Sequence, residues 1–232
     1  MTELTVLMPC LNEERSLAFC IAEARAYIES RGIEAEILIA DNGSTDRSRE
    51  ITAQNGARVI TVEERGYGAA LLGGIREARG KYVVMGDADG SYDFSSLDRF
   101  LAALREGNAL VMGNRFRGGI EKGAMPPLHH LGVPALSFFA RLRFRTSVGD
   151  FHCGLRAFDR ETALSLDLHC KGMEFATEMI AAFATSGARI AEVPTPLRRD
   201  RRNRRSHIRT FRDGFRHLAF ILTYKKKNKK ER

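Results

Sequence analysis

The stretch YVVMGDADGSYDF, residues 82–94, runs from an apolar segment directly into a group of carboxylates. Residues 82–85 predict a buried strand, and Asp87, Asp89 and Asp93 follow it closely. Carboxylates held close together repel one another, and each resists being taken out of water. A buried strand that ends in this way therefore predicts a site for a positively charged ligand.

Outward from this stretch, apolar runs alternate with helical patterns through the first half of the chain. Strands are predicted at 4–8, 36–40, 57–62, 82–85 and 109–113, and helices at 13–30, 46–54, 68–78 and 95–105, the last capped by Ser95. Such alternation is typical of right-handed βαβ units, so we expect an α/β fold with a Rossmann-like, mostly parallel sheet flanked by helices. In such sheets ligands bind beyond the carboxyl ends of the strands.

The loops that follow the predicted strands are polar and carry neither a GxGxxG nor a P-loop motif. PCLNE follows the first strand and ADNGSTD the second, while RGYGAA opens the third helix. Each loop alone has a structural explanation, since an acid such as Glu13 suits a helix start and Asn-Gly-Ser suits a turn. Several such loops on one sheet edge, together with Asp87 and Asp89, instead predict a shared ligand site.

The spacing of Asp87 and Asp89 suits a divalent cation. With the chain turning at Gly90, both carboxylates can face one crevice. Two hard oxygen ligands favour Mg²⁺ or Mn²⁺, which takes phosphate oxygens and waters as its other ligands. A nucleoside diphosphate would supply those phosphates. Asp93 fits a helix-capping role better than a ligand role.

The charge of the chain is concentrated at its end. The 232 residues carry a net charge of +8, with 44% hydrophobic and 28% charged residues, which is an ordinary globular composition. Residues 198–232 hold 15 of the 37 Lys and Arg but only three of the 29 acids. We therefore divide the chain into a domain at 1–197 and a basic loop, helix and Lys-rich tail at 198–232. No aromatic platform accompanies the basic residues, so nucleic-acid binding is not expected.

The basic region contains an amphipathic pattern. Phe211, Phe215, Leu218 and Leu222 fall on one stripe of a helix and are surrounded by Arg and Lys. A basic amphipathic helix suits an anionic membrane surface, and the alternative is that the stripe packs onto the domain. No apolar run reaches the ~20 residues needed to cross a bilayer, and the start of the chain does not read as a signal peptide. We expect a cytoplasmic protein, peripheral to the cytoplasmic face of the membrane.

The four cysteines show no metal-binding spacing. Cys10 and Cys20 are isolated, whereas Cys153 and Cys170 each follow a histidine. Adjacent residues of a strand point to opposite faces, so these His-Cys pairs are poor zinc ligands. We expect free thiols in a reducing compartment.

The loop motifs and their order resemble those of the family 2 glycosyltransferases, which have the GT-A fold. The second half continues the resemblance with GNRFRGGI (113–120), GDFHCGLRAF (149–158), GMEFATEMI (172–180) and AEVPTPL (191–197). This pattern is similar to the polyprenyl-phosphate members, the dolichyl-phosphate mannose and glucose synthases, and covers about residues 4–222. Many relatives continue into transmembrane helices after HLAFIL (217–222), so a membrane partner protein is an alternative to peripheral attachment.

The resemblance implies a role for individual residues. The residues expected to bind the donor are Pro9, Asn12, Glu13, Asp41, Ser44, Asp87 and Ala88. Asp87 and Asp89 are expected to hold the metal. Catalysis falls on Asp89, Arg115 and Asp150. Acceptor binding falls on Arg115 and Arg156, and on Arg202, Arg204 and His207 of a basic loop that closes over the site. Arg201 departs from the family pattern in that loop.

The predicted reaction is an inverting hexosyl transfer from a nucleotide sugar, UDP-glucose before GDP-mannose, to a polyprenyl phosphate. An anionic phosphate acceptor needs positive groups and a metal but no strong base, and arginine pairs bidentately with phosphate. A soluble saccharide or metabolite acceptor is the alternative. A sugar hydroxyl acceptor would require a base, for which Asp150 and Glu174 are candidates, although a structural ion pair explains each equally well.

Overall fold

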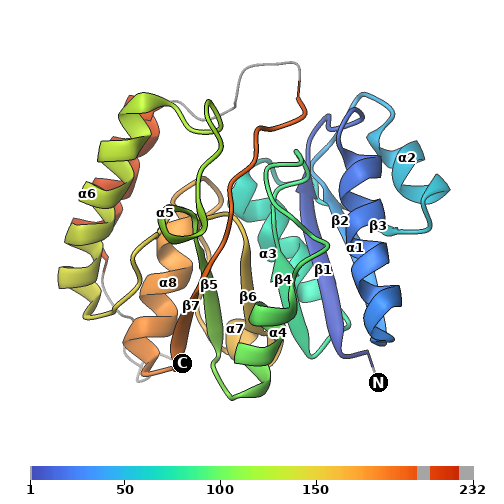
Figure 1. The fold of residues 1–232 in the computed structure, drawn as a ribbon. Coiled ribbons are helices and arrows are strands. Elements are labelled where there is room, and N and C mark those ends of the chain that lie inside the picture. Colours follow the sequence, from blue (N-terminus) through green and yellow to red (C-terminus); the bar gives the residue numbers. More distant parts are fainter. Residues whose placement is uncertain (1, 203–209, 225–232) are drawn as a thin grey trace.

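The computed structural model describes residues 2–202 and 210–224, with the side chains of 210–213 left out of the description. One seven-stranded sheet forms the middle layer, and helices cover both of its faces (Figure 1). The strand order is β3-β2-β1-β4-β6-β5-β7. The strands are β1 (Leu4–Cys10), β2 (Ala35–Asp41), β3 (Arg58–Thr61), β4 (Tyr82–Met85), β5 (Leu110–Asn114), β6 (Arg156–Asp159) and β7 (Ile190–Pro194).

The sheet is mostly parallel, as the sequence predicts. β1 pairs in parallel with β2 and β4, β2 with β3, and β5 with β7. β6 is the exception, because it inserts between β4 and β5 and runs antiparallel to both. The five predicted strands are confirmed to within two residues at each end, whereas β6 and β7 were recognised only as family motifs.

The helices that follow the strands also match the predicted alternation. They are α1 (Leu17–Arg31), α2 (Ser48–Gln54), α3 (Tyr67–Glu77), α4 (Asp98–Arg105), α5 (Arg115–Gly118), α6 (Pro127–Phe144), α7 (Arg160–Ser165), α8 (Phe175–Ser186) and α9 (Thr210–Thr223). The predicted cap of α4 is wrong. The helix begins after Leu97, and Ser95 instead donates its backbone N–H to Asp93 at 3.0 Å.

The core is split by the sheet into two apolar layers. Successive residues of β1 alternate between them, with Val6 and Met8 in the layer under α1 and α4, and Leu7 in the layer under α3 and α8. Burying both faces of the sheet makes its central strands continuously apolar. This leaves the polar loops after the strands as the place for chemistry.

The C-terminal helix α9 packs against α6 and α8 on one side of the molecule (Figure 1). His217 and Ile221 form its buried face. Phe215 and Leu222 of the predicted stripe are each 70% exposed, so the alternative that these two pack onto the domain is wrong. Phe211, Arg204, His207 and the Lys-rich tail lie outside the described side chains. Among the described residues, no helix combines the length and apolar character that a bilayer crossing requires.

Candidate active site

The loops after β1 and β2 are locked together by Asn12. Its side-chain oxygen accepts the N–H of Thr45 at 2.7 Å, and its own N–H donates to Ser44 Oγ at 2.9 Å. Asn12 holds a left-handed backbone with φ of 59°, which asparagine tolerates better than most residues. The predicted donor-binding residues Asn12 and Ser44 therefore lie side by side.

Asp41 closes the end of β2. It is 1% exposed, and its carboxylate accepts the N–H groups of Gly43 and Ser44, each at 3.2 Å. On the neighbouring strand end, Glu13 is 7% exposed and its N–H donates to Ser48 Oγ at 2.8 Å. The structure thus brings Pro9, Asn12, Glu13, Asp41 and Ser44 to one sheet edge, and their binding of a nucleotide stays a prediction.

Asp87 and Asp89 follow β4 on the same edge. Asp89 is 4% exposed and accepts the N–H of Ser91 at 2.9 Å. Asp87 lies against the backbone of Gly154, where an added Cβ would stand 2.5 Å from Asp87 Oδ2. Between the two acids, the carbonyl of Ala88 accepts a hydrogen bond from the Ser16 hydroxyl at 2.7 Å. The acidic turn is therefore held from both sides by the core of the domain.

The charge balance of this turn favours a cation. Burial raises the pKa of Asp87 above its ordinary value, and the nearby Asp89 carboxylate raises it further. Arg202 and a hydrogen bond from Tyr67 oppose the rise only in part. Asp87 and Asp89 together offer the hard oxygen donors that Mg²⁺ or Mn²⁺ prefers, so the donor set fits such an ion. Tyr67 was not among the predicted site residues. It is the first residue of α3 and follows Arg65 and Gly66 of the RGYGAA motif.

Residues 198–202, here called the basic strap, lie across the acidic turn. The backbone N–H of Arg201 donates to the carbonyl of Asp89 at 2.8 Å, and Arg198 pairs with Glu23 at 2.7 Å and Asp93 at 2.6 Å. Arg202 Nη2 lies 2.5 Å from Asp89 Oδ2, and Nη1 lies 3.6 Å from Glu13 Oε1. The predicted basic loop thus does reach the site through Arg202.

Arg201, which departs from the family pattern, has a different environment. Its guanidinium lies 3.5 Å from the centre of the Phe19 ring. This cation–π contact directs the charge onto α1 and away from the carboxylates. Arg201 and Arg202 therefore have separate roles within the strap.

Arg115 and Asp150 form a buried ion pair. Arg115 Nε and Nη2 donate to the two oxygens of Asp150 at 2.7 and 2.8 Å, and the backbone N–H of Arg115 adds a third bond. Arg115 is 9% exposed and Asp150 is fully buried. Both carboxylate oxygens of Asp150 orient the Arg115 guanidinium, and the predicted catalytic role of Asp150 stays a prediction. Of the two explanations that the sequence left open, the ion pair is the one observed.

Arg156 is engaged by the backbone of the domain, and its predicted acceptor role stays a prediction. It is 1% exposed, and its three guanidinium nitrogens donate to the carbonyls of Phe151, Cys153 and Ala176 at 2.6–3.1 Å. Every nitrogen of the side chain therefore serves the backbone around β6. Glu174, the other candidate base, pairs with Arg216 at 3.2 Å.

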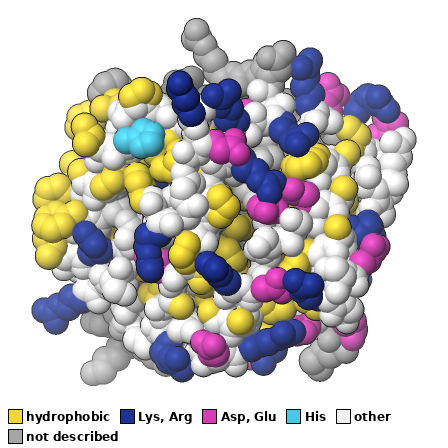
Figure 2. All heavy atoms as spheres, viewed as in Figure 1, with side chains coloured by type: hydrophobic (Ala, Val, Ile, Leu, Met, Phe, Trp, Pro, Cys, Tyr) yellow, Lys and Arg dark blue, Asp and Glu magenta, His cyan; other side chains and the backbone are white. Residues whose placement is uncertain are grey.

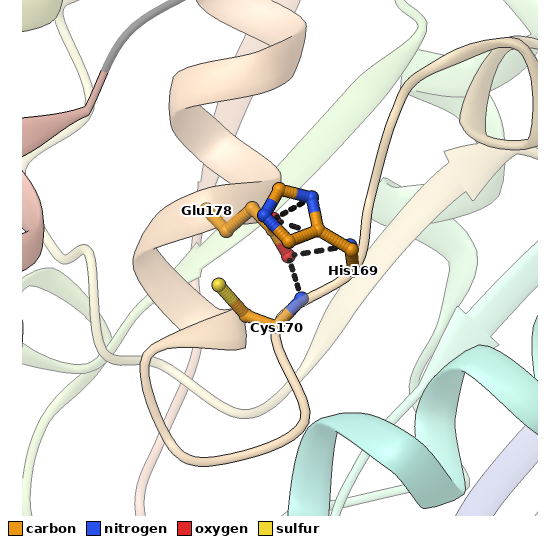
Figure 3. Close-up of side chains that lie close together, drawn as sticks. All are labelled: His169, Cys170 and Glu178. Carbon is orange, nitrogen blue, oxygen red and sulfur yellow. Dashed lines mark hydrogen bonds and ion pairs between the residues drawn. The ribbon is translucent and has the colours of Figure 1, made fainter.

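A second group of potential ligands lies where α8 meets the preceding loop (Figure 3). His169, Cys170 and Glu178 place their ligand atoms within 4.8 Å of one another, contrary to the expectation that the His-Cys pairs have poor geometry. Glu178 is 1% exposed and accepts the backbone N–H of Cys170 at 2.9 Å and that of His169 at 3.2 Å. Through these bonds Glu178 anchors the loop that holds His169 and Cys170 to α8, which explains why the three side chains lie together.

We expect Glu178→Gln to lower the free energy of unfolding by about 2 kcal/mol, because a buried carboxylate that accepts two partly buried backbone N–H groups is replaced by a neutral amide. His169→Ala keeps its N–H and should cost much less. EDTA should shift the melting temperatures of the native protein and of His169→Ala equally, because the proposed ion at Asp87 and Asp89 is common to both. A metal held by His169, Cys170 and Glu178 would instead make EDTA lower the melting temperature of the native protein more than that of His169→Ala, and His169→Ala would cost as much as Glu178→Gln.

Comparison with known proteins places these features in a family. Residues 5–165 match the model of glycosyl transferase family 2. The chain is 42% identical over 221 residues to the low-salt glycan biosynthesis hexosyltransferase Agl6 of Haloferax volcanii, covering 94% of this chain and 53% of that protein. It therefore spans about half the length of that relative. It is 33% identical to a dolichyl-phosphate hexose transferase of the same organism, covering 84% of this chain and 83% of that one.

Solved structures show the same fold. Glucosyl-3-phosphoglycerate synthase of Mycobacterium tuberculosis, in complex with Mn²⁺ and UDP-glucose, superimposes with a TM-score of 0.75 at 24% identity, covering 95% of this chain and 78% of that one. Its complex with Mn²⁺, UDP and phosphoglyceric acid gives a TM-score of 0.69 at 25% identity, covering 88% and 72%.

Proposed function

The chain belongs to glycosyl transferase family 2, and we propose that it moves a hexose from a nucleotide sugar to a polyprenyl phosphate with inversion at the anomeric carbon. UDP-glucose is the favoured donor and GDP-mannose the second candidate. The kinship with a dolichyl-phosphate hexose transferase supports this acceptor class. The site is proposed to work at the cytoplasmic face of a membrane.

The observation that carries the proposal is the carboxylate pair after β4, of half-buried Asp87 and buried Asp89. Asp87 and Asp89 would hold Mg²⁺ or Mn²⁺, and Mn²⁺ accompanies UDP in the related synthase structure at 25% identity. Such an ion supplies charge that stabilises the departing diphosphate. Asp41, Ser44 and Asn12 lie on the adjacent strand ends, where a nucleoside would fit beside the pair.

The acceptor would be held by arginine. A phosphate monoester is already anionic at neutral pH, so its attack requires orientation and charge neutralisation rather than a base. Asp150 engages Nε and Nη2 of Arg115 and fixes the plane of a guanidinium that carries five N–H donors. Arg115 and Arg202 are the favoured contacts, because the guanidinium nitrogens of Arg156 already donate to three backbone carbonyls.

A second candidate is transfer to a soluble phosphorylated metabolite. The related synthase was solved with phosphoglyceric acid, an acceptor that carries a phosphate but no lipid. Arg115 and Arg202 could hold the phosphate of such an acceptor, but a hydroxyl nucleophile would also require a general base, for which Asp150 and Glu174 are the candidates.

The test is transfer from a panel of radiolabelled nucleotide sugars to undecaprenyl phosphate or dolichyl phosphate, with Mn²⁺ and with EDTA. We expect metal-dependent label in the lipid phase from one donor. Label that stays in water while nucleoside diphosphate is released would leave the donor half of the proposal standing and refute the lipid acceptor. Absence of turnover with every donor would refute the proposed function.

A further inference from the structure

Of the nine large hydrophobic side chains that the described part of the chain exposes, seven lie on two neighbouring helices, and the other two are Phe116 and Leu164. Those on α6 are Leu128, Leu131, Phe138, Phe139 and Leu142, and those on α9 are Phe215 and Leu222. Exposure reaches 78% at Leu131 and 70% at both α9 positions. Figure 2 shows hydrophobic side chains at the left edge of the molecule, over α6. Scattered exposed apolar residues are normal, but a gathered set marks an interaction surface.

The set follows helical periodicity. Leu128, Leu131, Phe138 and Leu142 recur at intervals that keep them on one face of α6, while Ser137, Ala140 and Phe144 form its buried face. Phe215 and Leu222 are seven residues apart on α9, opposite the buried His217 and Ile221. Each helix therefore packs one face on the core and exposes a second face that carries large apolar side chains.

The two helices are fixed to each other at their C-terminal ends. Arg143 Nη2 donates to the carbonyl of Tyr224 at 2.8 Å, and the rings of Phe144 and Tyr224 meet edge to face at 5.4 Å. His217 Nδ1 lies 2.8 Å from Thr177 Oγ1 of α8, which holds α9 from beneath. These contacts hold the two helices against each other, and we call their exposed apolar side chains together the α6–α9 face.

The charge around this face is positive. No Asp or Glu occurs between Glu121 and Asp150, and Arg141, Arg143 and Arg145 cluster at the end of α6. In the sequence, KKKNKK follows directly after Tyr224. Apolar side chains flanked by cations match an anionic lipid surface, where each basic residue adds attraction.

We propose that the α6–α9 face inserts its apolar side chains into the headgroup region of an anionic bilayer. A second copy of the chain is the main competing occupant. A two-fold dimer would place each patch against itself, and the like charges of the two arginine clusters would then repel. The inference rests on the proposed function for its purpose, since it would hold the site next to a lipid-borne acceptor.

The protein contains no tryptophan, so a single introduced one reports insertion without background. We would make Phe138→Trp and Phe215→Trp, with Leu164→Trp as the matched control on α7, where Leu164 is 43% exposed. With vesicles of phosphatidylcholine and phosphatidylglycerol, the first two should shift to the blue and be quenched by brominated lipid. The control should do neither. Vesicles of phosphatidylcholine alone should bind much less, and added salt should weaken binding.

Loss of binding is tested by Leu131→Glu combined with Phe138→Glu. Removing two inserted apolar side chains should lower vesicle partitioning by about a hundredfold, while Leu164→Glu should leave it unchanged. Circular dichroism confirms that each variant is folded. Equal quenching of all three tryptophan variants, or no vesicle binding, would overturn the proposal. A concentration-dependent dimer that buries the introduced tryptophan of Phe138→Trp without lipid would overturn it in favour of a second copy.

These assays need neither donor nor acceptor, so they separate the two proposals. Vesicle binding without sugar transfer would support the membrane role of the α6–α9 face and refute the proposed transferase function. Transfer to detergent-dispersed polyprenyl phosphate without vesicle binding would do the reverse.

Discussion

Asp89→Asn is expected to abolish sugar transfer while leaving the fold intact. Asparagine keeps the size of the side chain and an oxygen for the Ser91 N–H, which Asp89 accepts at 2.9 Å. It removes the negative charge that we propose to hold the cation and that pairs with Arg202. Loss of metal-assisted stabilisation of the leaving group should lower the rate by about a thousandfold or more. Initial rates with saturating donor and Mn²⁺ measure this.

The matched control is Asp93→Asn, which removes the same charge from the same loop. Asp93 pairs with Arg198 of the basic strap at 2.6 Å and does not belong to the carboxylate pair. Its substitution should change the rate by less than about threefold, since a partly exposed ion pair contributes little. Mn²⁺ binding followed by electron paramagnetic resonance should be lost in Asp89→Asn and kept in Asp93→Asn. Equal effects of the two substitutions would show that total charge of the loop, rather than metal binding, is what matters.

The sequence was sufficient for the parts of the fold that repeat a simple pattern. Apolar runs such as residues 82–85 are buried on both faces, so strands and their alternation with helices could be read directly. The acidic turn was recognisable because clustered carboxylates after a buried strand conflict with burial unless something compensates them. β6 was not predicted as a strand, because it is only four residues long and both its first and its last residue are charged.

The motifs assign roles to charged residues but do not show how those residues are packed. Arg156 and Asp150 were assigned to the site, yet both are buried and engaged by protein partners, Arg156 by backbone carbonyls and Asp150 by Arg115. Their roles in the reaction stay predictions. The α9 stripe shows the related problem for apolar residues. Periodicity identified an amphipathic helix, but only tertiary packing decides that His217 and Ile221 face the core while Phe215 and Leu222 face outward.

Arg156→Met should strongly destabilise the protein. Three buried carbonyls, of Phe151, Cys153 and Ala176, would lose their donors at once. Leaving such groups unpaired should lower the free energy of unfolding by about 3–5 kcal/mol. In a protein of this size that corresponds to a fall in melting temperature of about 10 °C. Differential scanning calorimetry measures it.

Arg160→Met is the matched control, because Arg160 also donates to backbone carbonyls, those of Ile75 and Arg76, from a half-buried position near the surface. It should lower the melting temperature far less, since water can replace its bonds. If Arg156 only supports β6, the folded fraction of Arg156→Met keeps a normal KM for the acceptor. A normal melting temperature with a raised acceptor KM would instead restore the acceptor role that the motif predicted. Should Arg156→Met fail to accumulate, Arg156→Lys keeps the charge but cannot reach three carbonyls, so the same comparison can be made at lower temperature.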